Sequence, residues 1–196
     1  MTIHLKALGG LLLLAGLSGC ATTSTTDRLG LPPLKTVPKV DLSRYLGTWY
    51  EIAKFPQWFQ AGCTGTTATY DKREDGEIDV TNRCYLEALD GEVERADGRA
   101  RVLDDKTNAK LEVTFFRPFW GDYWIIDLAP DYSYAVVGSP GRDYLWILSR
   151  SPTMAADVYE GILARLRAQK YPLDRLELTV QPGAVRQSKL TPPASN

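Results

Sequence analysis

Short apolar runs alternate with turn residues from Asp41 to about residue 150. The runs are rich in Tyr, Trp, Phe, Val, Ile and Thr, and turns such as Asp75-Gly76 and Pro140-Gly141 separate them. This pattern is typical of antiparallel β-strands. It predicts eight strands, at residues 48–55, 64–72, 77–85, 93–103, 109–117, 122–129, 133–138 and 143–150. Because eight antiparallel strands are enough to close a barrel, we expect an all-β domain.

The hydrophobic period changes after Ser151-Pro152. Val158, Ile162, Leu163 and Leu166 form one apolar stripe at helical spacing, which predicts a helix that ends near residue 170. Ser151 is the expected N-cap and Pro152 suits the first turn. We expect the stripe to pack against the outside of the barrel, followed by a short strand at 176–180 and a disordered tail at 184–196.

The N-terminal residues have the order of a secretory signal peptide, which we assign to 1–19. Lys6 precedes an apolar block from Ala7 to Leu17, and small residues lead to Cys20. The block is too short to span a membrane, which needs ~20 apolar residues. Residues 21–40, which follow Cys20, are rich in Thr and Pro and are expected to form a flexible linker. The folded domain is then expected at 41–183.

Composition excludes several kinds of function. The formal net charge is −1, without the basic surface that nucleic-acid binding requires. The only histidine, His4, lies in the predicted leader, so the remaining chain lacks an imidazole for catalysis or metal binding. We therefore expect a protein that is not an enzyme and has no cofactor, no metal site and no nucleic-acid partner.

Two cysteines of the predicted domain face an oxidising compartment if the chain is exported, and thiols there usually pair. Cys63 and Cys84 lie at the open ends of the Asp75-Gly76 hairpin, nearly opposite one another, which favours a cross-strand disulfide. Strict alternation, however, puts Cys63 outward and Cys84 inward. The disulfide therefore requires a bulge or bend near Cys63.

Three motifs resemble those of the lipocalin family, in the family's order and spacing. They are Gly47-Thr48-Trp49, Asp131-Tyr132-Ser133-Tyr134 and the segment 145–150, LWILSR. The likeness is closest to bacterial outer-membrane lipocalins and apolipoprotein D, and it covers roughly residues 40–183. It implies an eight-stranded up-and-down antiparallel lipocalin barrel with one C-terminal α-helix packed outside. Trp49 and Arg150 are expected to stack at the closed end in a structural role.

The N-terminal segment Leu17-Ser18-Gly19-Cys20 resembles the lipobox of bacterial lipoproteins. This resemblance implies that Cys20 is acylated and anchors the chain to a membrane. Ala21 follows where an aspartate would favour the inner membrane, so the outer membrane is implied, with the barrel facing the periplasm.

The residues expected inside the barrel come from alternation and from the resemblance. Alternation places Glu51 on the face of Trp49, and Val113 on the face of Leu111 and Phe115. The resemblance implies that the pocket is lined by Tyr70, Asn82, Phe115, Tyr123 and Trp146. An apolar cup with polar groups would suit a fatty acid or lysophospholipid. Glu51 serves equally well as a structural hydrogen-bond acceptor.

Two alternatives to a lipid carrier stay open. The first is a lipocalin-fold isomerase that uses Cys63 as its nucleophile, although no imidazole is available to activate that thiol. The second is a structural barrel whose interior is filled by side chains. The sequence also leaves open whether two barrels associate as a homodimer.

Overall fold

The computed structural model describes residues 30–183 of the chain. The expected signal peptide, Cys20 and the expected C-terminal tail lie outside these residues. No helix in the described part of the chain is long and apolar enough to cross a membrane.

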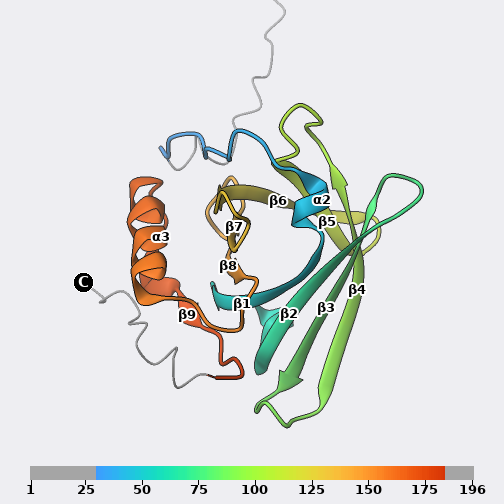
Figure 1. Ribbon diagram of the computed structural model, residues 1–196, viewed down its shortest axis with the longest axis vertical. Helices are drawn as coiled ribbons and strands as arrows, with labels where there is room; N and C mark the ends of the chain where they lie inside the picture. The colour runs from blue at the N-terminus through green and yellow to red at the C-terminus, as the bar shows by residue number, and fades with distance from the viewer. Residues whose placement is uncertain (1–29, 184–196) are drawn as a thin grey trace, which may run out of the picture.

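The strands form one closed antiparallel barrel, which confirms the predicted fold class (Figure 1). Its neighbours follow the order β2-β3-β4-β5-β6-β7-β8-β1, and the pairing of β1 with β2 closes it. The barrel strands are β1 Gly47–Lys54, β2 Cys63–Lys72, β3 Ile78–Leu86, β4 Val93–Val102, β5 Lys110–Phe116, β6 Phe119–Leu128, β7 Tyr134–Gly138 and β8 Leu145–Ser149. A ninth short strand, β9 Glu177–Leu178, adds to β1.

Alternation along the strands produces two hydrophobic cores. Leu148 and Ile125 lie in the core inside the barrel, while their neighbours Ile147 and Ile126 lie in a second core outside it. The C-terminal helix α3 Ala156–Ala168 covers the second core and contributes Ile162 to it. It lies outside the strands, beside β7, β8 and β9 (Figure 1). The helix thus packs where its apolar stripe predicts.

The start of α3 differs from the sequence expectation. The helix begins at Ala156 with Ala155 as its N-cap, and no side chain caps it. Ser151 was the expected cap, but its hydroxyl accepts a hydrogen bond from the Thr153 amide, 3.4 Å away. A serine that bonds its own backbone two residues on stabilises a turn instead of a helix start.

A short helix precedes the barrel and marks its closed end. α2 Leu42–Tyr45 is capped by Asp41, whose carboxylate accepts from the Ser43 amide at 2.9 Å. The expected linker already contacts the barrel before Asp41, because the Val37 amide donates to the Ile125 carbonyl and Val40 is fully buried. The loop η1 Trp58–Gln60, between β1 and β2, belongs to the opposite, open end.

The C-terminal segment fills a gap in the barrel wall. β1 and β2 pair only as far as Tyr50 and Thr67, and then separate toward the open end. Beyond this point the Thr179 amide donates to the Ile52 carbonyl, and the Val180 carbonyl accepts from the Gly65 amide. The expected strand at 176–180 is thus a two-residue strand whose continuation bridges β1 and β2.

The predicted disulfide between Cys63 and Cys84 is present, with 5.4 Å between the Cα atoms. The pairing of β2 with β3 shifts register between Thr64 and Thr67. This irregularity lies beside Cys63, where the alternation argument required it, and it brings the two side chains together despite their predicted opposite faces.

Candidate ligand-binding site

The closed end of the barrel is built around Trp49, which is fully buried. The guanidinium of Arg150 stacks on its ring, 3.7 Å from the centroid, and the indole nitrogen donates to the Tyr45 carbonyl. Arg150 also donates to the carbonyls of Arg44, Tyr45, Leu46 and Thr48. The expected stacking of these two signature residues is therefore present, and Arg150 ties α2 to β1.

The other two signature positions lie at turns near this end. Gly47, the first residue of β1, has a φ of +86° and a carbon placed on it would lie 3.5 Å from the Arg150 guanidinium. Asp131, in the loop between β6 and β7, accepts from the Ser133 amide at 3.0 Å. Both residues shape backbone in the closed end of the barrel.

Three buried tyrosines form a hydrogen-bonded chain inside the barrel, near its closed end. The Tyr123 hydroxyl lies 2.7 Å from that of Tyr45 and 2.8 Å from that of Tyr70. Burial raises the pKa of Tyr70 to about 12 and raises the pKa values of Tyr45 and Tyr123 as well, so all three stay neutral near pH 7. Sequence reasoning found two of them and missed Tyr45, because α2 directs that residue into the barrel from outside the strands.

The middle of the barrel is lined by small or half-buried side chains. Paired residues of an antiparallel ladder share a face, and Ala68 pairs with the buried Trp49 and with Asn82. In the same way Ala100, in the inner core, pairs with Val113, which pairs with Gly121. Ala68, Asn82 and Val113 are only half-buried although they face inward. Inward-facing side chains are thus fully buried around Trp49 and partly exposed at Ala68, Asn82 and Val113.

A polar cluster lies around Glu51, nearer the open end of the barrel. This carboxylate is 2% exposed and accepts from the Thr179 hydroxyl at 2.5 Å and from the Gln60 amide at 2.9 Å. Gln60 in turn accepts from the Trp146 indole nitrogen at 3.0 Å. One glutamine side chain therefore connects the η1 loop to both β1 and β8 across the open end.

Burial raises the pKa of Glu51, and the hydrogen bonds from Thr179 and Gln60 and the charge of Lys54 oppose that rise. A buried carboxylate with a raised pKa favours its uncharged form more than an exposed one does. Gln60 lies between two predicted strands, and Thr179 lies in the short strand predicted at 176–180 after the helix. Alternation along each strand could not indicate that these two residues meet Glu51.

Trp146 and Phe115 differ in how far they follow their predicted positions. Trp146 is half-buried and packs against the inner core, as its place on β8 with Leu148 predicts. Phe115 is 44% exposed and lies across Gly98, which leaves no room for a side chain there. The pairing of β5 with β6 shifts register between Val113 and Phe116, so simple alternation ends before Phe115.

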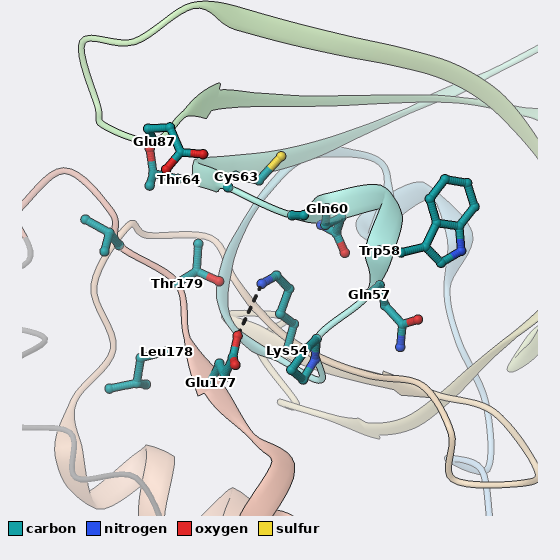
Figure 2. Close-up of a pocket in the computed structure, with 14 residues that line it drawn as sticks. Lys54, Gln57, Trp58, Gln60, Cys63, Thr64, Glu87, Glu177, Leu178 and Thr179 are labelled. Atoms are coloured by element: carbon teal, nitrogen blue, oxygen red, sulfur yellow. Dashed lines mark ion pairs between the residues drawn. The ribbon is translucent and has the colours of Figure 1, made fainter.

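A cavity of about 560 Å³ lies at the open end, where β1 and β2 separate. The η1 loop and the 177–180 segment border it, and Lys54 extends into the space between them (Figure 2). Sequence reasoning missed Lys54. A register shift in β1 between Glu51 and Ala53 turns Lys54 toward the barrel, where it pairs with Trp146.

The disulfide removes Cys63 as a free thiol, which leaves the isomerase alternative without its nucleophile in this state. Among the described residues, Cys63, Cys84 and Glu94 bring potential metal ligands together. Two of those three ligand atoms are the sulfurs of the disulfide, so this group does not have the chemistry of a metal site.

These features define a β-barrel with a packed closed end and a cavity at its open end, and comparison with known proteins gives its family. The lipocalin-like domain family matches residues 40–181, and the chain belongs to this family. The outer membrane lipoprotein Blc of Citrobacter freundii is 42% identical over 156 residues, which cover 78% of this chain and 87% of that protein. Apolipoprotein D of Rattus norvegicus is 39% identical over 154 residues, covering 72% and 79%.

Solved structures agree with the fold. Insecticyanin from the tobacco hornworm Manduca sexta superposes with a TM-score of 0.60 at 24% identity, covering 80% of this chain and 88% of that chain. At this identity the likeness concerns the fold alone.

Proposed function

We propose that this lipocalin binds, stores or transports an amphipathic lipid, either a fatty acid or a lysophospholipid, inside its barrel. The observation that carries this proposal is the difference in side-chain burial between the closed end of the barrel and the rest of its inner wall. Trp49 and the tyrosine chain are packed at the closed end, whereas Ala68, Asn82 and Val113 face inward and stay half-buried. A lined barrel with one open end accommodates an acyl chain, and each buried methylene contributes ~0.8 kcal/mol.

Polar groups at two heights support an amphiphile over a purely apolar ligand. The tyrosine hydroxyls lie low in the barrel, and Glu51, Gln60 and Lys54 lie at its open end. A lipid with one polar end can hydrogen-bond to these polar groups through that end, while its acyl chain covers the apolar side chains of the barrel wall. Catalysis is not required for this function.

Lipid extraction from the purified protein, followed by mass spectrometry, tests the proposal. A carrier should release a fatty acid or lysophospholipid in a fixed molar ratio to protein. Delipidated protein should then show saturable quenching of its tryptophan fluorescence by either lipid, with Trp146→Phe reducing the signal. A barrel that releases no lipid and shows no saturable quenching would be a filled structural barrel.

We also propose that Cys20 carries acyl chains and holds the protein at the outer membrane, with the barrel on the periplasmic side. The relatives named outer membrane lipoprotein Blc support this location. Two or more acyl chains suffice for stable anchoring. Membrane fractionation with mass analysis of the N-terminal peptide tests it, and Cys20→Ala should move the protein to the soluble fraction. Sedimentation of that soluble variant decides whether two barrels associate, which the sequence leaves open.

A further inference from the structure

Two loops at the open end of the barrel expose large aromatic side chains. Trp58, in the loop between β1 and β2, is 88% exposed, and Phe59 beside it is exposed as well. At the hairpin between β5 and β6, Phe116 is 75% exposed and Phe119 is 70% exposed. Alternate connections of an up-and-down barrel lie at the same end, so both loops belong to the open end. Among residues 30–183, Leu103 is the one large apolar side chain that is exposed at the closed end.

These four aromatic side chains take no part in either hydrophobic core. The rings of Trp58 and Phe59 meet edge to face with centroids 5.7 Å apart, and those of Phe116 and Phe119 stack with centroids 6.2 Å apart. Figure 2 shows Trp58 extending from the η1 loop away from Lys54 and the cavity. Exposed apolar patches of this kind mark interaction surfaces.

Charge divides the rim of the open end into two sides. Residues 55–62 contain no charged side chain, and residues 115–121 contain only Arg117, whereas the β3–β4 connection at 87–92 has the acidic sequence EALDGE. The strand order places the β7–β8 connection between the two aromatic loops, and the acidic connection across the rim from it. A surface that carries phosphate groups repels the acidic side and accepts the aromatic side.

The N-terminal segment leaves the barrel on the aromatic side of this rim. Val40 lies at the closed end, where its amide donates to the Thr107 carbonyl in the β4–β5 connection at 2.7 Å. The segment runs from there along the barrel to Pro32, whose carbonyl accepts from the Arg142 guanidinium at 2.6 Å. Arg142 belongs to the β7–β8 connection and is buried. This contact therefore fixes Pro32 beside the part of the rim that separates the two aromatic loops.

The distance from this point to the proposed anchor is short. Residues 21–31 separate Cys20 from Pro32, and even a fully extended chain of that length spans at most about 40 Å. A membrane that holds an acylated Cys20 lies within that distance of the β7–β8 connection. Tryptophan and phenylalanine suit the boundary between headgroups and acyl chains, because their rings are largely apolar.

We propose that the aromatic side of the open end docks on the phospholipid bilayer that carries the anchor, with Trp58 and Phe119 inserted among the headgroups. The inference rests on the proposed acylation of Cys20 and adds an orientation to it. Acyl chains alone determine where the protein is held, whereas contacts through two loops determine which end of the barrel faces the bilayer. The acidic β3–β4 connection then points away from the phosphates.

Quenching of Trp58 by lipid tests this orientation. The acylated protein is reconstituted into vesicles of equal parts phosphatidylethanolamine and phosphatidylglycerol, with or without bromine on the acyl chains. The emission of the parent minus that of Trp58→Phe isolates Trp58 from the other tryptophans. The matched control, Trp58→Phe with Leu103→Trp, moves the exposed tryptophan to the closed end. Brominated lipid should quench most of the Trp58 emission and leave the closed-end tryptophan unquenched.

The outcomes distinguish the docked orientation from the proposed anchor. If the acylated protein pellets with the vesicles and Trp58 is not quenched, or if both positions are quenched equally, the docking is overturned while the anchor stands. Shielding of Trp58 from acrylamide that appears only at high protein density, without quenching by brominated lipid, also overturns it and assigns the aromatic loops to a second copy of the chain. If mass analysis finds no acylation of Cys20, the anchor proposal fails; quenching of Trp58 alone would still support docking, and its absence would overturn both.

Discussion

Arg150 and Trp49 form a stacked pair in which the guanidinium lies 3.7 Å from the ring centroid and donates to four backbone carbonyls. This arrangement closes one end of the barrel and holds α2 against β1. Hydrogen bonds from a charged donor and a cation–π contact are each worth roughly 1–3 kcal/mol.

We therefore predict that Arg150→Ala lowers the free energy of unfolding by about 2–3 kcal/mol. Urea denaturation followed by circular dichroism measures this loss. Lys at the same position keeps the charge but lacks the planar fork, and it should recover only part of the stability. An Arg150→Ala protein as stable as the parent would show that the closed end does not depend on this pair.

Trp146 should affect binding more than stability. Its ring is half-buried on the inner wall and its nitrogen donates to Gln60 at the open end. Trp146→Ala is expected to weaken lipid binding at least about tenfold, because it removes a large apolar contact surface. Trp146→Phe keeps most of that surface and should cost about threefold or less.

The comparison with Arg150→Ala checks this division of roles. Arg150→Ala should leave the affinity of the folded protein nearly unchanged. If instead Arg150→Ala abolished binding in a stable protein and Trp146→Ala only lowered stability, the assignment of the two residues would be reversed.

The tyrosine chain predicts unequal costs for removing its hydroxyls. Tyr123 lies between Tyr45 and Tyr70, so Tyr123→Phe leaves two buried hydroxyls without their partner. This substitution should cost about 2–4 kcal/mol of stability, whereas Tyr70→Phe, which leaves the other two hydroxyls bonded together, should cost about 1 kcal/mol. Thermal and urea denaturation of both variants measure the difference. Equal costs would mean that the hydroxyls do not act as a chain.

Glu51 predicts a specific dependence of stability on pH. Burial raises its pKa in the folded protein above the ordinary value of 4.5, so the folded state binds a proton more tightly than the unfolded state. The Glu51 contribution to stability is therefore favourable at low pH, and it declines as the pH rises from 4.5 through the raised pKa.

Glu51→Gln removes this titration, and the variant should gain stability relative to the parent as the pH rises through that window. Parallel urea titrations of the two proteins at several pH values provide the measurement. The opposite trend, with the parent gaining on the variant as the pH rises, would show that hydrogen bonds and the Lys54 charge outweigh desolvation.

The strands were predictable from local rules, and the closed end of the barrel from the family resemblance. Alternation and turn residues indicate the strands, whereas the Trp49–Arg150 pair was implied by the resemblance of its motifs to those of lipocalins. The conflict between the faces of Cys63 and Cys84 even predicted an irregularity, which the structure has between Thr64 and Thr67. The inferences about the strands and the disulfide need only the residue order and the two-residue period of a strand.

The open end was less predictable because register shifts change which side chains face inward. The shift after Glu51 turns Lys54 into the barrel, and the shift after Val113 ends the alternation before Phe115. Gln60 and Thr179 reach Glu51 from a loop and from the C-terminal segment. Contacts between elements so distant in the chain depend on tertiary packing, which a local period does not contain.

The central claim is that a lipid chain occupies the barrel interior, and a spin-labelled fatty acid tests it most directly. With a nitroxide near the methyl end, the label should broaden the methyl NMR signals of Ala68 and Val113 on the inner wall. The signals of Ile52 and Ile147, which face α3 outside the barrel, should stay sharper. Reduction of the nitroxide should restore all signals. Broadening that is strongest at Ile52 and Ile147, or absent from Ala68 and Val113 at saturating lipid, would contradict a ligand inside the barrel.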